Sequence, residues 1–525
     1  MPRRTSSLLL AIAMVAGGWI HGAFAQAPEA PRFDIQRFVV EGNTILPQDE
    51  VERIVAPFAG KARDFGDVQR ALEALEVAYH DRGYSATRVL VPEQDLKAGE
   101  VRLQVLESRI RNVRVEGNRF FDDANVRASL PSVVVGEPPN MRRVNENIQL
   151  ANENPAKKVR LVLESTSEQG KVDAVVKVDD DKPTRISVFL DNSGNGPTGY
   201  YRAGVGYQHA NLFNRDHVLT AQVITSPTRI SDVMVFGVGY RVPLYQWNGA
   251  VDVFAGYSNV NSGTVADLFT VSGSGSVYGI RYTQILRRLG EYEQKLALGW
   301  DYRDFHNDVA LVGVPGSLIP DITLKPLSLT YYGRLAQVGR DIAFSVGYSQ
   351  NLAGGADGDQ SAFDAIRAGA TARYGIWRFG AAYTQALPGE LLFRALLSGQ
   401  YTTNALVPGE QFGLGGADNV RGYFERTAAN DIGHRAQVEL YSPELGPNIG
   451  ADWKARMLVF TDWGRGRDNQ PVRTGENVLG SLGVGIRANR GKSLALRLDW
   501  AQVTHAAGTR DEGKDRVHFS VSYTF

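Results

Sequence analysis

The final stretch of the chain, Val517 to Phe525, reads VHFSVSYTF and shows a strict alternation from which the predicted architecture follows. Valine, phenylalanine and tyrosine alternate with histidine, serine and threonine. An alternation with a period of two residues is typical of a β-strand whose two faces meet different surroundings. The same alternation recurs upstream, and it is clearest in Met234 to Val242, Leu482 to Ala488 and Leu494 to Trp500.

The two faces of these strands differ in chemistry. One face is apolar, with aromatic residues at its ends, and the other carries small or charged residues. A membrane β-barrel produces this contrast, because its exterior meets lipid and its interior meets water. A soluble β-sandwich also alternates, since it buries its apolar face. Strand length and strand number favour the barrel. So does Phe525, because a C-terminal aromatic residue closing an amphipathic strand is the usual outer-membrane insertion signal.

Residues 184–525 are therefore predicted to form a transmembrane β-barrel of sixteen antiparallel strands. An even number closes a barrel with both chain ends on one side, and closure pairs the backbone groups that hydrocarbon cannot solvate. The tenth strand is overlong and could divide at Tyr374-Gly375. We keep it whole, because short turns then fall on one side and long loops on the other. The predicted strands are 184–192, 198–210, 216–226, 231–243, 247–258, 275–287, 292–304, 325–337, 340–351, 364–386, 391–403, 432–442, 454–463, 478–488, 492–503 and 514–525.

A repeat precedes the barrel. Phe38 to Asn43 reads FVVEGN and returns as VRVEGN at Val113 to Asn118, about 75 residues later, which is long enough for a small domain. Each copy continues with two helical segments and two strands, so residues 33–108 and 109–180 are predicted to be small α+β domains. Each has a three-stranded sheet with an open edge, to which an extended client could add a strand. Rigid spacers are the alternative interpretation.

The N-terminus indicates export. Residues 1–25 have a positive start, an apolar run from Leu8 to Ile20 and an Ala23-Phe24-Ala25 cleavage box, so they read as a signal peptide. The mature chain is then expected to begin at Gln26, although an uncleaved anchor helix is the alternative. The chain has no cysteine and a formal net charge of zero, which excludes thiol chemistry and gives no sign of nucleic-acid binding.

No enzyme is legible in the sequence. We find no HExxH motif, no P-loop and no cysteine nucleophile, and the 8 histidines are scattered. The acidic run Asp179 to Asp181 is expected to be a solvated linker rather than a calcium site. The sequence therefore predicts no catalytic residues, no bound metal and no cofactor.

One long loop stands out among the strands. Residues 404–431 are too rich in glycine for a helix and too long for a hairpin turn, and long loops inside ordered architecture are usually functional. Turn glycines are the simpler interpretation of its composition. Its central tetrapeptide is Val420, Arg421, Gly422 and Tyr423.

This tetrapeptide, the wall segment FTDWG and the tandem small domains resemble the two-partner secretion outer-membrane transporters, the TpsB family with ShlB, FhaC and HecB, of the BamA-like superfamily. In that family the small domains are called POTRA domains, and the ANENP segment at residues 151–155 resembles the second of them. The resemblance implies that the loop folds back into the barrel and that Arg421 reaches Asp462, with Glu439 nearby. A loop arginine exposed to solvent is the alternative. The wall residues implied as partners are Phe460, Asp462, Gly464 and Glu439.

The resemblance also implies a function. The chain would sit in the outer membrane of a Gram-negative bacterium, with its POTRA domains in the periplasm. It would bind an unfolded exoprotein there and export it through the barrel without ATP. The other expected partners are outer-membrane lipids and the barrel assembly machinery. The alternatives are a factor that assembles other barrels and, less in keeping with POTRA domains, a diffusion porin.

One departure from the family concerns the plug. Many relatives carry an N-terminal helix that plugs the pore, whereas here only residues 26–32 would precede the first POTRA strand. No plug helix fits in this segment. We therefore expect the folded-in loop alone to close the barrel.

Overall fold

The computed structural model describes residues 31–95, 99–196, 198–259, 261–265, 269–272, 274–306, 321–469, 476–505 and 513–525. The predicted signal peptide and the predicted mature start at Gln26 lie outside these residues. The chain divides into two compact units, Met1–Asp81 with Thr87–Glu107 and Arg82–Ala86 with Ser108–Phe525. None of the helices in the described residues is both long and apolar enough to cross a membrane.

The first unit is a small α+β fold. Helix α2 (Phe65–Asp81) packs on α1 (Gln48–Val55) and on β4, and buries Val68, Leu75 and Tyr79 at helical spacing. The sheet order is β2-β5-β4, with β2 parallel to β5 and β4 antiparallel to it. The predicted order is present, with the short pair β1 and β3 in addition. The strands are β1 (Phe33–Ile35), β2 (Arg37–Glu41), β3 (Gly60–Arg63), β4 (Thr87–Leu90) and β5 (Glu100–Glu107).

The second unit begins with the repeat of this fold. Its sheet order is β6-β8-β7, again with one parallel and one antiparallel pair. Asp122 caps α3 and Asn140 caps α4 through side-chain oxygens that accept backbone N–H groups. The elements are β6 (Arg109–Glu116), α3 (Asp123–Ala128), α4 (Met141–Ala151), β7 (Lys157–Ser165) and β8 (Lys171–Asp180).

The repeated Glu-Gly-Asn motif is a turn in both copies. Gly42 and Gly117 have φ of +80° and +89°, and a Cβ on Gly117 would lie 2.5 Å from the Val178 carbonyl oxygen. Only glycine fits this turn without strain. The asparagine side chain then donates to a carbonyl three residues ahead, over 2.8 Å from Asn43 and 2.9 Å from Asn118. The motif repeats because the same tight turn ends the first strand of the sheet in each domain.

An acidic residue at the end of the last strand closes each turn. Asp180 accepts from the backbone N–H groups of Arg119, Phe120 and Phe121 over 2.9–3.1 Å, and Glu107 accepts from Thr44 and Ile45. Asp180 is only 6% exposed. The expectation of a solvated acidic linker is therefore wrong at Asp180, because satisfying buried donors requires a buried carboxylate.

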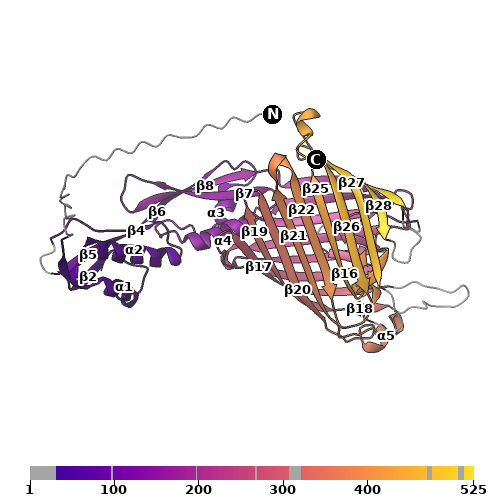
Figure 1. Ribbon diagram of the computed structural model, residues 1–525, viewed down its shortest axis with the longest axis horizontal. Coiled ribbons are helices and arrows are strands. Elements are labelled where there is room, and N and C mark those ends of the chain that lie inside the picture. Colours follow the sequence, from indigo (N-terminus) through magenta and orange to yellow (C-terminus); the bar gives the residue numbers. More distant parts are fainter. Residues whose placement is uncertain are drawn as a thin grey trace, which may run out of the picture. The chain divides into compact units, whose positions relative to one another are not determined.

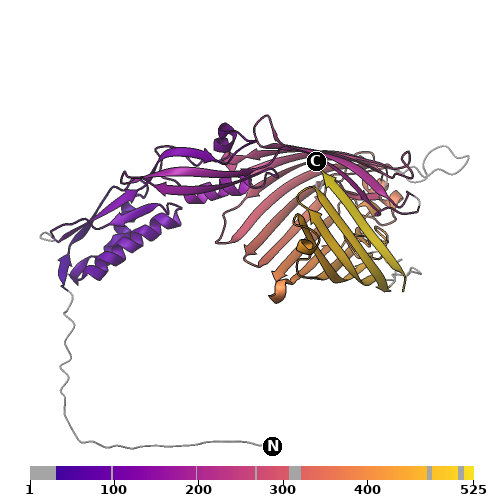
Figure 2. The ribbon, with the colours of Figure 1, turned by 90° about the horizontal axis from the view of Figure 1, so that it is seen from above.

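The rest of the second unit is a closed antiparallel barrel of sixteen strands, as predicted. The last strand pairs with the first, and Figure 2 shows the yellow C-terminal strands meeting the magenta first strands. Strand β18 continues β19 along β17, so the two count as one. The strands are β9 (Thr184–Asp191), β10 (Arg202–Leu212), β11 (His217–Thr225), β12 (Met234–Leu244), β13 (Gly249–Ser258), β16 (Gly275–Ile285), β17 (Tyr292–Phe305), β18 (Ile322–Leu324), β19 (Pro326–Gln337), β20 (Arg340–Asn351), β21 (Gly375–Ala386), β22 (Leu392–Tyr401), β25 (Ile432–Tyr441), β26 (Trp453–Arg467), β27 (Asn477–Arg490), β28 (Leu494–His505) and β29 (Asp515–Thr524).

The tenth strand is shorter than predicted. It begins at Gly375, and the predicted extension at 364–374 is wrong: it holds the end of helix α5 (Gln360–Ile366) and a turn. The Asp359 carboxylate caps α5 by accepting from the Ala362 N–H over 2.9 Å. Figure 1 shows α5 at the end of the barrel, close to β18. Phe363 and Tyr374 are buried in one hydrophobic cluster with Ile322 and Leu324 of β18. Burial of these two side chains in the cluster competes with strand pairing of residues 364–374. The alternation pattern in the sequence does not indicate this cluster.

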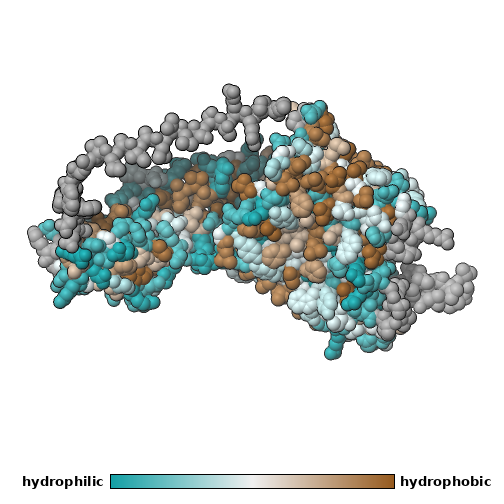
Figure 3. All heavy atoms as spheres, viewed as in Figure 1, coloured by the Kyte–Doolittle hydropathy of each residue, from teal (hydrophilic) through white to brown (hydrophobic). Residues whose placement is uncertain are grey.

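The two faces of the barrel wall have the predicted chemistry. On β27 the side chains of Leu482, Val484 and Ile486 are exposed on the outside, while Gly483 and Gly485 lie on the buried inner face. Figure 3 shows hydrophobic residues gathered over the outer surface of the barrel strands. The C-terminal Phe525 is exposed, with its ring 4.8 Å from that of Tyr523. This wall suits lipid outside and polar contacts inside.

Candidate functional site

The long loop folds back into the barrel. After β22 the chain forms the short hairpin β23 (Phe412–Leu414) and β24 (Ala428–Asn430), and then enters β25. Gly415 and Gly416 at its turn have φ of +95° and +123°, so they are turn glycines as well as part of the inserted loop. We call residues 412–430 the lumen hairpin.

Arg421 at the tip of the lumen hairpin is held by two acidic residues of the barrel wall. Its side chain and that of Asp462 are 0% exposed. Arg421 Nε and Nη2 donate to the two carboxylate oxygens of Asp462 over 2.6 and 2.7 Å, and its backbone N–H donates to the same group. Nη1 donates to Glu439 Oε1 over 2.8 Å. The Phe460 ring centroid lies 3.4 Å from the guanidinium carbon. The predicted partners are thus in contact.

The rest of the tetrapeptide is also engaged. Gly422 has φ of +95°, and its N–H donates to His518 Nε2 over 2.9 Å. The Tyr423 hydroxyl oxygen accepts from the Gly480 N–H over 3.2 Å. Its single hydrogen faces two carbonyl oxygens, those of Gly480 and His505, and can be donated to either. Val420 is fully buried. These contacts join the tip to β27, β28 and β29.

Gly464 has a steric role. A Cβ at this position would lie 2.8 Å from Leu414 Cδ2 and 3.0 Å from Val420 Cγ2, which are both buried. The absence of a side chain therefore lets the lumen hairpin lie directly on β26. Close packing without a void is what makes such a contact sensitive to added atoms.

We expect Gly464→Leu to push the lumen hairpin off the wall. Overpacking of this kind costs about 1–3 kcal/mol, so the fraction of hairpins in contact should fall. Limited trypsin digestion of outer membranes should then cleave at Arg421, which is buried in the native barrel. The matched control is Val459→Leu, on the outer face of the same strand. Equal protection of both variants would contradict the steric role.

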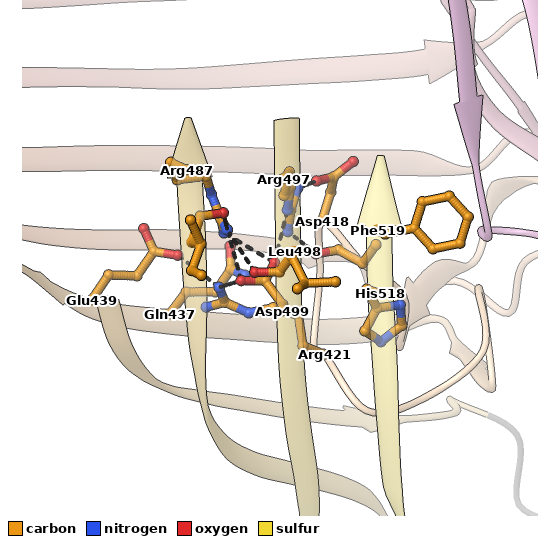
Figure 4. A network of polar contacts seen from close by, with 12 residues as sticks. Asp418, Arg421, Gln437, Glu439, Arg487, Arg497, Leu498, Asp499, His518 and Phe519 are labelled. Atoms are coloured by element: carbon orange, nitrogen blue, oxygen red, sulfur yellow. Dashed lines mark hydrogen bonds and ion pairs between the residues drawn. The ribbon is translucent and has the colours of Figure 1, made fainter. Parts of the chain in front are cut away.

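Three side chains that meet the tip, those of Asp499, Gln437 and His518, were not predicted to be its partners from the sequence. Asp499 is fully buried, and its carboxylate oxygens pair with Arg487 and Arg497 over N–O distances of 2.7 and 2.8 Å. The Arg421 Nη1 atom lies 3.8 Å from Asp499 Oδ1. Figure 4 shows these groups converging, with His518 on the neighbouring strand. Gln437 donates to the Asn419 carbonyl over 2.7 Å. Alternation placed Asp499, Gln437 and His518 on the inner face, but only strand register brings them to the tip.

The charges around the tip balance. Four carboxylates face four guanidinium groups in one network of ion pairs, made of Asp418, Glu439, Asp462 and Asp499 with Arg394, Arg421, Arg487 and Arg497. Buried ion pairs of this kind are costly to break on one side only, because the remaining charge has no solvent. No cluster of three or more metal-ligating side chains occurs in the part of the chain that the structure describes.

A family comparison identifies the chain. The family model described as "Haemolysin secretion/activation protein ShlB/FhaC/HecB" matches residues 170–488. The chain belongs to this family. A second model, "POTRA domain, ShlB-type", matches residues 33–108. The protein is accordingly an outer-membrane transporter of two-partner secretion in a Gram-negative bacterium, not an enzyme, and its family transports exoproteins.

Individual relatives have low sequence identity to this chain, but they align with most of its length. The outer membrane transporter CdiB of Dickeya dadantii is 23% identical over 79% of this chain and 73% of its own. The heme/hemopexin transporter protein HuxB of Haemophilus influenzae is 21% identical over 91% of this chain and 85% of its own. The solved structure of CdiB from Escherichia coli has a TM-score of 0.78 at 20% identity, over 95% of this chain and 92% of that one. The structural likeness shows a shared fold.

The base of the lumen hairpin in this transporter has anchors of its own. Glu410, just before the hairpin, is buried and binds Arg303 of β17 and, over 2.9 Å, Arg378 of β21. Asp431, just after the hairpin, is buried and binds Arg367. Neither carboxylate was singled out from the sequence. No motif marks them, because their partners come from distant strands and from the α5 loop.

Backbone contacts reinforce this base. The Gln400 side chain donates to the carbonyls of Glu410 and Asp431 over 2.9 and 3.1 Å. Asp431 also accepts from the backbone N–H groups of Leu406 and Asn469 over 3.1 and 2.9 Å. The lumen hairpin is therefore held at both of its ends, by Arg421 at the tip and by two buried carboxylates at the base.

Proposed function

We propose that this transporter takes an unfolded exoprotein from the periplasm and exports it through its barrel to the cell surface without ATP. The observation that carries the proposal is the buried contact of Arg421 with Asp462 inside a barrel that follows ShlB-type POTRA sequence. The two POTRA domains, residues 33–108 and 109–180, would receive the client on the open edges of their sheets. Residues 1–25 would be the signal peptide and residues 184–525 the barrel.

The site residues have distinct parts in this proposal. Arg421, with Asp462 and Glu439, holds the lumen hairpin in its resting position. Phe460 and Gly464 shape the wall beneath it, and Gly422 and Tyr423 fix the tip. The exposed Phe525 is the signal that the barrel assembly machinery reads, and the apolar outer wall is the surface for outer-membrane lipids.

A comparison of proteomes tests the function. We would measure secreted and outer-membrane proteins in strains with and without this transporter. Loss of one large exoprotein from the medium, with other outer-membrane proteins unchanged, is the expected result and would name the client. A broad fall in outer-membrane proteins would instead identify an assembly factor, and the proposal would be wrong.

Closure of the pore gives a second prediction. If the lumen hairpin alone closes the barrel, the unmodified protein should show a small resting conductance in planar bilayers. Replacement of residues 415–425 by a short Gly-Ser linker should raise it several-fold, because a folded loop no longer fills the lumen. The same replacement in the turn at 444–451, between β25 and β26, is the control. A pore that stays tightly closed after the loop replacement would mean that another segment plugs it.

A further inference from the structure

The barrel end that carries the second repeat is locked on one side. Lys157 of β7 and Asp216, in the turn between β10 and β11, form an ion pair of 2.6 Å whose side chains are 0% and 1% exposed. Lys157 also donates to Asn125 over 2.8 Å, and the Tyr245 hydroxyl donates to Asp216. Burial lowers the pKa of Lys157, and the Asp216 carboxylate offsets part of that shift. Separation of the two would strand a buried charge.

Further contacts extend this locked side around the barrel rim. Asn147 donates to Asn248 over 2.7 Å, and Asn154 donates to the Ala210 carbonyl over 2.7 Å. Glu153 binds both Arg241 of β12 and Lys295 of β17. Ala210 belongs to the same hydrophobic cluster as the core of the second repeat. Separation of the second repeat from the rim between β10 and β17 would therefore break several buried contacts and carry a high cost in free energy.

A cavity of about 780 Å³ lies beside these contacts on the same rim, where β9, β10 and β11 meet the C-terminus. We call it the rim cavity. Ser187, Gln208 and Thr220 line it, and they share the inner face of their strands, since Gln208 lies opposite Thr220 in the sheet. Residues of β9 on the other face, such as Val188, are exposed to the outside. The cavity therefore belongs to the lumen side of the wall, where no lipid lies.

The rim cavity has a basic border. Arg119, Lys182, Arg185 and Lys492 line it, against the Asp181 side chain and the terminal carboxylate of Phe525. Asp181 pairs with Lys492 over 2.6 Å and with Arg185 over 3.4 Å, and the hydrogen bond from Lys492 holds the pKa of Asp181 below its usual value. The four cations still outnumber the carboxylates at this border. Phe120 adds an exposed aromatic ring, which the backbone hydrogen bonds to Asp180 hold in place. Small neutral side chains, one ring and excess positive charge suit an extended polypeptide that carries carboxylates.

We propose that the rim cavity is where an extended, acidic segment of the exoprotein passes from the second POTRA domain into the barrel. This inference rests on the proposed function and makes it more specific. Because buried contacts such as Lys157–Asp216 hold the second repeat on the rim, the cavity stays beside Arg119 and Phe120 of that repeat, and the basic border selects segments that carry Asp or Glu. Its wall of serine, glutamine and threonine presents short neutral side chains, which an extended chain can pass without a strong contact at any one position.

Single-cysteine crosslinking tests this position, because the native chain has no cysteine. Thr220→Cys places a thiol in the rim cavity, and Thr384→Cys places one on the inner face of β21. The client would carry one cysteine beside an acidic stretch and a folded domain that stalls its export. We expect a disulfide adduct at position 220 in at least about tenfold excess over position 384. Equal adducts, or none at position 220 while export continues, would overturn the inference.

A charge-reversal variant gives an independent test. Arg119→Glu combined with Lys492→Glu should lower export of a client with an acidic segment several-fold, and export should recover when the client's acidic residues are changed to lysine. Lys454→Glu, outside the cavity lining, is the control. Export unaffected by the double change would overturn the role of the basic border. If the cysteine-free protein exported no client at all, the proposed function would fail, and this inference with it.

Discussion

Arg421→Ala is expected to reduce export of the exoprotein at least about tenfold while the barrel still reaches the outer membrane. The change leaves Asp462 and Glu439 buried without their shared guanidinium group. Removal of one partner of a buried pair costs about 3–5 kcal/mol, which corresponds to roughly two to four orders of magnitude in an equilibrium at about 1.4 kcal/mol per tenfold. The tip should therefore leave the wall, whereas the backbone ladder of the barrel is untouched.

Two further variants sharpen this result. Arg421→Lys keeps the charge but loses the planar fork that fits a carboxylate, so we expect an intermediate loss of export. Arg456→Ala removes an inner-face arginine that bonds the carbonyls of Glu390 and Ser442 and does not touch the lumen hairpin, so it should export normally. Export would be measured in the medium and barrel level in outer membranes. Normal export by Arg421→Ala at normal level would reject the anchoring role.

Glu410→Ala is expected to release the base of the lumen hairpin and raise the resting conductance several-fold. Arg303 and Arg378 would lose the buried carboxylate that both of them bind. The cost should lie near the lower end of about 3–5 kcal/mol, because Arg303 keeps Asp301 as a counter-charge over 2.7 Å and the Arg378 side chain is partly exposed to solvent. Planar-bilayer recording measures the conductance, and export measures the functional consequence.

The control for the base is a surface pair. Glu476 binds Arg465 on the exposed end of the barrel, with both side chains more than two-fifths exposed. Pairs of this kind contribute about 0–1 kcal/mol, so Glu476→Ala should leave the conductance unchanged. Combining Glu410→Ala with Arg421→Ala tests whether base and tip act together, because coupled sites give non-additive effects. Strict additivity would mean that the two ends of the hairpin are held independently.

Much of the barrel could be read from alternation alone. A strand between lipid and a wet lumen must repeat every second residue, so the faces of Leu494 to Trp500 and Val517 to Phe525 followed directly from their sequence. The strand number also followed, since only an even closed set fits the turns. The predicted strand extension at residues 364–374 was wrong, because Phe363 and Tyr374 are buried in a hydrophobic cluster near the loops. No local sequence pattern indicates that cluster.

The contacts of the candidate site were likewise predictable only in part. From the sequence we could mark a long glycine-rich loop with Arg421 at its centre, with a solvent-exposed arginine as the alternative, and the family resemblance implied Asp462 as its partner with Glu439 nearby. Only the tertiary structure showed that Asp499 and His518 meet the tip and that Glu410 meets Arg303 and Arg378. Alternation fixes which way a side chain points, whereas barrel closure and register decide its height on the wall. Those depend on pairings between strands far apart in the chain, which no single stretch of sequence contains.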